Sequence, residues 1–139
     1  MIESILWIQF LASYWMMVVI LFVQITHYPL FRFVADPDRK AYFLNHQRSI
    51  SFMVVPSMLI ELFSLCYIVF LNPKDIFWTG MLVLLGLIWL STFFIQVPYH
   101  NALLKQPTDY IVKKLVQSNW IRTVLWSIKT LAIGGYMFL

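Results

Sequence analysis

The residues best suited to chemistry lie in two similar polar stretches, each at the end of a long apolar run. They read FVQITHYP (residues 22–29) and FIQVPYHN (residues 94–101). Both begin with phenylalanine, an aliphatic residue and glutamine, and end with histidine, tyrosine and a proline close together. An imidazole can exchange protons near neutral pH or bind a metal, and an amide can hydrogen-bond a ligand. The repetition indicates two matching walls of one polar site. The residues are Gln24, His27, Gln96 and His100.

Four apolar runs must position these walls. They cover roughly residues 4–31, 48–71, 76–99 and 117–139. Each is as long as the ~20 residues that a helix needs to cross a bilayer. The chain is 61% hydrophobic and 12% charged, whereas soluble domains average about 25% charged residues. The sequence therefore predicts an all-α, multi-pass integral membrane protein with the lipid bilayer as its partner.

Three short proline-containing connections separate the helices. They read DPD, NPKD and QPTD, and each combines a polar residue that can cap a helix with a proline and an acid suited to the first turn. The helices are expected near residues 4–34, 37–71, 73–104 and 107–137 of one domain, 1–139. Such short connections favour antiparallel neighbours. We expect a four-helix up-down transmembrane bundle, and the repeated stretch suggests a tandem repeat of two helical hairpins.

Basic residues indicate how the helices are oriented. Eight of them flank the first and third connections: Arg32, Arg39, Lys40, Arg48, Lys105, Lys113, Lys114 and Arg122. The second connection holds only Lys74. Because cationic loops stay in the cytoplasm, both termini should be extracytoplasmic. Topology and contact with anionic lipid account for the net charge of +4, so nucleic acid is not an expected partner.

Counting from the short turns gives the depth of each residue, because positions equidistant from a turn lie level. His27, His46 and His100 should share one layer near the cytoplasmic face. One turn deeper, a second layer should hold Gln24, Arg48 and Gln96. Deeper still, Glu61 should lie level with Lys129, within about 6 Å, near enough to pair or to bridge through water.

Helical spacing gathers the polar residues into one stripe per helix, since positions three, four or seven apart share a face. The stripes are Gln9, Ser13, Ile20, Gln24 and His27; His46, Ile50, Met53, Ser57 and Glu61; Trp89, Thr92, Gln96 and His100; and Asn119, Arg122, Trp126 and Lys129. Polar side chains within a membrane face the bundle interior. We therefore expect one polar interior that opens toward the cytoplasm.

The histidine layer has three interpretations. Two or three imidazoles of His27, His46 and His100 would bind a metal or haem if they converged on it. As neutral imidazoles they would instead handle a ligand or a proton. In the third interpretation they simply hydrogen-bond to glutamine, tyrosine and backbone. No cofactor is required by the sequence, and the spacing fits no local metal-ligand motif.

The charged residues inside the membrane also have alternatives. Glu61 and Lys129 either form an ion pair that fixes helix register or make Glu61 an acid or base for proton transfer. Arg122 either extends toward the interface or, with Arg48 on the same side, binds an acidic, phenolic or enolate oxygen. Trp89 would stack on a flat ligand; the same holds for Trp126.

The segment QVPYHNALLKQPTDYIVKKLVQSNWIRTVLW resembles small bacterial four-helix membrane proteins related to the anthrone oxygenase-like family. HYPLF and PSMLIE add to the resemblance in the first half. The resemblance implies a bacterial inner-membrane protein, a small aromatic or quinone-like substrate and cofactor-independent oxygenation. It singles out His27, Glu61, Gln96, His100, Asn119 and Arg122. A second resemblance, to membrane-associated eicosanoid and glutathione enzymes, rests only on Arg48 and Glu61.

The leading hypothesis is a pocket for a small hydrophobic or aromatic molecule, with oxidoreductase chemistry of the oxygenase type. Its catalytic residues would be Glu61, His100 and His27. Its ligand-binding residues would be Gln24, Gln96, Arg48, Asn119, Arg122, Trp89, Trp126 and Lys129. The alternatives are a non-enzymatic carrier or accessory membrane subunit, and a metal or haem protein. Substrate, reaction and oligomeric state stay open, a homo-oligomer being one arrangement.

Overall fold

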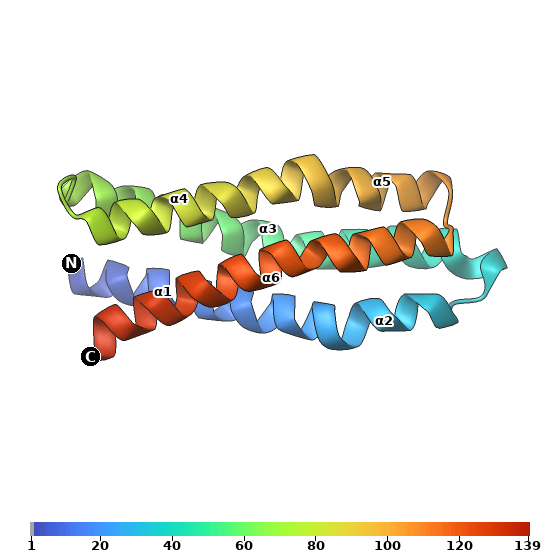
Figure 1. Cartoon of the computed structure of the whole chain (residues 1–139), viewed down its shortest axis with the longest axis horizontal. Coiled ribbons are helices and arrows are strands. Elements are labelled where there is room, and N and C mark those ends of the chain that lie inside the picture. Colours follow the sequence, from blue (N-terminus) through green and yellow to red (C-terminus); the bar gives the residue numbers. More distant parts are fainter. Residues whose placement is uncertain (1) are drawn as a thin grey trace.

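The computed structural model describes residues 2–139, which form four long helical rods lying side by side (Figure 1). The first rod comprises α1 (Ile2–Phe22), η1 (Val23–His27), α2 (Tyr28–Leu30) and η2 (Phe31–Phe33). The second comprises η3 (Asp36–Asp38) and α3 (Arg39–Leu71). The third comprises α4 (Ile76–Ser91), η4 (Thr92–Gln96) and α5 (Val97–Lys105), and the fourth is α6 (Asp109–Phe138). The two termini lie at the same end of the molecule (Figure 1). The described chain is thus all-helical, as the sequence predicts.

Three of the four rods are long and apolar enough to cross a membrane. They are Ile2–Phe33, Asp36–Leu71 and Ile76–Lys105. The fourth, α6, is 30 residues long, but it carries Asn119, Arg122 and Lys129, which lower its hydropathy. All three of these side chains are buried against the other helices. The first three rods thus have the length and the apolar composition that the predicted membrane-crossing helices require.

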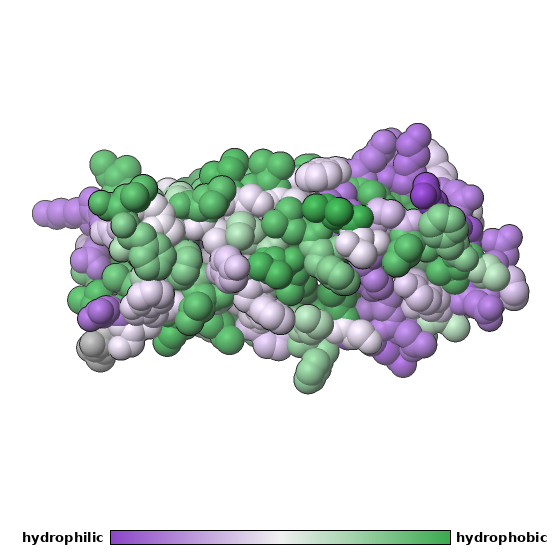
Figure 2. All heavy atoms as spheres, turned by 90° about the horizontal axis from the view of Figure 1, so that it is seen from below, coloured by the Kyte–Doolittle hydropathy of each residue, from purple (hydrophilic) through white to green (hydrophobic). Residues whose placement is uncertain are grey.

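The outer surface of the rods is rich in large apolar side chains. Those more than half exposed include Phe22, Ile25, Phe52, Phe63, Phe70, Ile76, Phe94 and Leu131. Figure 2 shows hydrophilic residues gathered at the end that holds the connections after η2 and α5, with hydrophobic residues across the middle of that face. Apolar side chains of this size are stable against lipid rather than water, which fits a membrane protein.

Helix starts differ from the predicted ones at two of the three connections. Asp75 caps α4, accepting hydrogen bonds from the backbone N–H groups of Phe77 and Trp78. Thr108 caps α6, accepting from the N–H of Ile111. The prolines of NPKD and QPTD therefore precede the helices instead of opening them. Only in DPD does the proline stand in the first turn, that of η3.

Arg39 links two connections at the hydrophilic end of the molecule. Its Nε donates to the carbonyl of Val34 at 3.0 Å, and its Nη1 donates to the carbonyl of Pro107 at 3.2 Å. The same guanidinium pairs with Asp36 at 3.2 Å and with Asp109 at 2.8 Å. A residue expected only as a topology signal thus also holds two connections together.

Candidate functional site

Both predicted walls lie where a helix widens into a π-helical segment. In η1 the N–H of Tyr28 donates to the carbonyl of Val23, and in η4 the N–H of Val97 donates to that of Thr92. A proline follows each segment at its second position, and a proline ring disfavours the regular bond four residues back. Each π turn inserts one residue, which rotates later side chains by about 100° relative to an unbroken helix. The repeat in sequence is thus also a repeat in backbone geometry.

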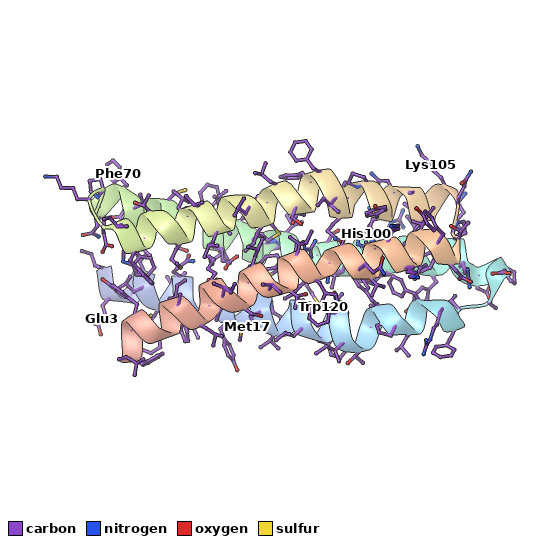
Figure 3. All side chains as sticks on the ribbon, in the orientation of Figure 1. Glu3, Met17, Phe70, His100, Lys105 and Trp120 are labelled. Carbon is purple, nitrogen blue, oxygen red and sulfur yellow. The ribbon has the colours of Figure 1, made fainter. Side chains whose placement is uncertain are left out.

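The three histidines lie together, as their predicted depths require. Nε2 of His27 is 2.8 Å from Nδ1 of His46, and these rings stack. The ring of His46 also stacks on His100, with centroids 5.7 Å apart. Nε2 of His100 lies 3.2 Å from the hydroxyl of Tyr28. His100 points from α5 toward the other helices, whereas Lys105 points outward (Figure 3).

This histidine layer consists of two hydrogen-bonded pairs, His27 with His46 and Tyr28 with His100, which are joined by the stacking of His46 on His100. Among residues 2–139, no group of three or more His, Cys, Asp or Glu side chains is arranged to hold a metal ion. Nε2 of His27 and Nδ1 of His46 face each other and Nε2 of His100 faces a tyrosine hydroxyl at hydrogen-bond distance, whereas the buried Nε2 of His46 has no partner. The donor geometry therefore favours the second and third interpretations of His27, His46 and His100.

A cavity of about 230 Å³ lies beside the histidine layer. Its apolar wall comes from the first three rods and includes Met16, Ile20, Val54, Met58 and Trp89. Its polar wall is formed by Tyr28, Gln47, Thr92, Gln96, His100 and Arg122. The cavity therefore combines a mainly apolar interior with a few polar groups, the usual composition of a small-molecule site.

The mouth of the cavity faces sideways. Four exposed lining residues mark it: Ser51 and Val55 on α3, with Phe93 and Val97 on η4 and α5. Toward the hydrophilic end the bundle is filled by Phe31, Phe43 and Leu103, each no more than 2% exposed. Buried side chains thus fill the hydrophilic end, and the exposed lining residues of the cavity lie on the side of the bundle.

Arg122 is the one charged residue in the cavity wall. Its side chain is only 7% exposed, and its Nε has no hydrogen-bond partner. Within residues 2–139, no carboxylate lies within ion-pair distance of it, since the ion pairs involve Arg39 and Lys129. Its guanidinium carbon lies 5.4 Å from the ring centroid of Trp126. Arg122 is thus a buried cation facing an apolar cavity.

The predicted glutamine layer divides in two. Gln96 lines the cavity, where its Nε2 donates to Ser118 at 2.9 Å and its Oε1 has no partner. Gln24 instead accepts from Nδ2 of Asn119 at 2.8 Å and donates to the carbonyl of Val116 at 3.2 Å. Gln24 and Asn119 therefore hydrogen-bond to each other inside the bundle and do not line the cavity, and Oδ1 of Asn119 has no partner.

Arg48 does not join that layer. Its side chain is exposed and lies in a shallow outer groove with Phe52, Pro56 and Leu104. It stands two residues from His46, so it points roughly 200° away around the helix. The prediction that Arg48 lies with Gln24 and Gln96 used only its depth along the bundle and not its direction around the helix. Arg48 therefore lies outside the cavity wall that contains Arg122.

Glu61 and Lys129 form the predicted pair at the centre of the bundle. Nζ of Lys129 lies 2.5 Å from Oε1 of Glu61, and neither side chain is exposed. Ser13 donates to the same Oε1 at 2.6 Å, and Nε1 of Trp126 donates to Oε2 at 3.0 Å. With its amide oxygen turned toward the ammonium, Gln9 lies 3.2 Å from Nζ. Each charge is fully partnered.

This central cluster is separate from the cavity. Glu61 and Lys129 are absent from the cavity wall, and Trp126 packs over them with no exposure of its own. Of the two predicted aromatic ligand contacts, only Trp89 lines the cavity. The arrangement favours the ion pair that fixes helix register over proton transfer by Glu61 and over ligand binding by Lys129.

Two features of the site were missed from the sequence. Tyr28, 3% exposed and bonded to His100, lies off the stripe of an unbroken helix and was not expected inside. On α3 the interior stripe continues from Ile50 through Val54 and Met58, whereas Met53 is 42% exposed. For Tyr28, the available signal was the proline that follows it, Pro29, because proline disturbs the preceding helical turn.

Comparison of the chain with protein-family models, with curated proteins and with solved structures gives no match.

Proposed function

We propose that this protein is an up-down four-helix membrane protein whose cavity binds a small hydrophobic, aromatic molecule. The ligand enters sideways from the bilayer. The observation that carries this proposal is the cavity itself, with its mouth between exposed residues of α3 and α5 and its polar groups inside. A molecule dissolved in lipid would reach Phe93 and Val97 before it met Arg122 and His100.

The size of the cavity limits the ligand. An engineered apolar cavity of about 150 Å³ holds benzene, while drug-sized ligands occupy roughly 300–1,000 Å³. A volume of about 230 Å³ therefore suits a molecule of one or two rings. Part of a longer substituent would project through the mouth into lipid.

The proposed orientation follows from charge. The hydrophilic end carries Arg32, Lys40, Lys105 and Lys113, all exposed, whereas the opposite connection carries Lys74. In the bacterial inner membrane this end would face the cytoplasm and both termini would face outward. The matching π segments before Pro29 and Pro98 support a tandem repeat of two hairpins.

A cavity-filling substitution tests the binding proposal. Val54 lies in the cavity wall, and Ile60, on the same helix, is 50% exposed on the outer face. Full-length protein in lipid nanodiscs is titrated with 4-butylbenzoate and with 4-butylphenol. Saturable binding of at least one probe should be lost in Val54→Trp and kept in Ile60→Trp. Binding of neither probe, or equal binding by both variants, would overturn the proposal.

The contact between His100 and Tyr28 favours a second, enzymatic function at the same site. His100 would take the hydroxyl proton of a bound phenol, and Arg122 would stabilise the resulting oxyanion. The oxygenase resemblance suggests a reaction of the type 1-naphthol plus O₂ to 1,4-naphthoquinone plus water. Oxygen uptake by the purified protein with 1-naphthol, slowed in His100→Gln, would support it. No uptake above that of empty nanodiscs would leave a carrier as the function.

A further inference from the structure

We infer that the natural ligand of the cavity is a small monocarboxylate with an apolar body, bound as its anion by Arg122. This inference rests on the proposed binding function and adds the chemical class of the ligand. It begins from the contrast between Arg122 and the other two buried cations. Lys129 pairs with Glu61, and Arg39 pairs with Asp36 and Asp109. Arg122 has no such partner among residues 2–139.

No acidic residue of the chain is left to neutralise Arg122. The sequence contains six acidic residues: Glu3, Asp36, Asp38, Glu61, Asp75 and Asp109. Only Glu61 is buried, and Lys129, Ser13 and Trp126 already occupy both of its oxygens. A buried charge without a partner is strongly destabilising. The missing negative charge is therefore best supplied by a molecule in the cavity.

The position of Arg122 argues for a ligand within the cavity rather than a phospholipid head group. Arg122 stands 13 residues after Asp109, the first residue of α6. That distance is roughly 20 Å along the helix, well below the charged side chains at its start. The guanidinium also faces inward, with 7% exposure. A phosphate at the membrane surface would meet Lys113 and Lys114 first.

A carboxylate fits this site better than a phenol does. The planar guanidinium matches the two oxygens of a carboxylate in a bidentate arrangement. A carboxylic acid with a pKa of about 4 is ionised near neutral pH, whereas a phenol with a pKa of about 10 is not. Only the carboxylate brings the compensating charge with it. The apolar wall formed by Ile20, Val54 and Met58 would then hold the ring or chain.

The test compares head groups on one apolar body. Full-length protein in nanodiscs is titrated at neutral pH with 4-butylbenzoate, its neutral isostere 4-butylbenzamide, and 4-butylphenol. The Val54→Trp variant gives the background of partition into lipid. Because hydrogen bonds to a buried charge are strong, the benzoate should bind about 10- to 100-fold more tightly than the amide. Octanoate, tested alongside, shows whether the acid must be aromatic.

Arg122→Gln should remove the preference for the acid, and Arg122→Lys should keep part of it. Lys113→Gln, which removes an exposed charge from the same helix, should change nothing. If the amide binds as tightly as the benzoate and Val54→Trp abolishes both, the cavity is a ligand site but the carboxylate inference is wrong. Retention of the acid preference in Arg122→Gln would also overturn it. If no probe binds above background, the proposed function itself fails.

Discussion

The guanidinium carbon of Arg122 lies 5.4 Å from the ring centroid of Trp126. The indole N–H of the same Trp126 donates to Glu61 at 3.0 Å. Trp126 thus contacts both the paired charges at the centre and the unpaired cation in the cavity wall. The two buried cations on α6 differ in their surroundings: Lys129 is neutralised by Glu61, whereas no carboxylate pairs with Arg122. Substitutions at these two positions should therefore have opposite effects.

Breaking the central pair should destabilise the protein. Glu61→Gln or Lys129→Met alone leaves one buried charge unpaired, and each should lower the free energy of unfolding by about 3–5 kcal/mol. The double variant should recover a large part of that loss, because neither charge remains. Denaturation of the four proteins in one detergent measures the coupling. Strictly additive losses would show that the two side chains do not stabilise each other.

Replacing Arg122 should change the free energy of unfolding in the opposite direction. Arg122→Met removes an unpaired buried charge and should raise the free energy of unfolding of the ligand-free protein by about 1–3 kcal/mol. The same variant should lose the preference for acidic ligands. Thermal unfolding in detergent, with Lys113→Met as the control on the same helix, measures the change. A loss of stability as large as that of Lys129→Met would mean that Arg122 has a structural partner.

The depth of each residue along the bundle was predictable from the sequence. The direction of its side chain around the rod was only partly predictable. Short connections fix which residues lie level, so the meeting of His27 with His46 and of Glu61 with Lys129 followed from counting. To predict these contacts it was enough to add the rule that polar side chains face the interior of the bundle. The all-helical fold followed in the same way from the long apolar runs.

The direction of individual side chains was harder to predict, because an unbroken helix was assumed. The π turns of η1 and η4 each shift the helical register of the residues that follow. The shift after η1 turns Tyr28 toward the interior, which the spacing of an unbroken helix does not predict. The position of Arg48 was mispredicted for a different reason. Counting placed it at the depth of Gln96, but its side chain lies on an exposed face of α3 and not on the interior face. The sideways mouth depends on how Phe31, Phe43 and Leu103 fill the hydrophilic end, and no local pattern encodes that packing.

Removal of the His100 imidazole should affect binding more than folding. His100 makes one hydrogen bond, to Tyr28, and it lies on the cavity wall. His100→Ala should weaken binding of 4-butylbenzoate while lowering the free energy of unfolding by only about 1 kcal/mol. Calorimetric titration and denaturation of the same preparation measure both. If His100→Ala unfolds as readily as Glu61→Gln, the histidine layer is structural.

The orientation of the chain can be tested without a ligand. Because exposed basic residues gather at the connections after η2 and α5, at the end opposite the termini (Figure 1), both termini should be extracytoplasmic. A reporter that is active only in the cytoplasm should stay silent when it is fused after Leu139. The same reporter inserted in the connection between α5 and α6 should be active. Activity at Leu139 would reverse the proposed orientation.

The central claim is that a small apolar acid enters the cavity sideways between α3 and α5. Photolabelling tests it most directly, with a diazirine-bearing benzoate added to the full-length protein in nanodiscs and the adducts mapped by mass spectrometry. We predict adducts on cavity and mouth residues such as Val54, Val55, Phe93 and Val97, which excess 4-butylbenzoate removes. Adducts spread over outward-facing residues such as Ile60 and Ile128, unchanged by the competitor, would contradict the account.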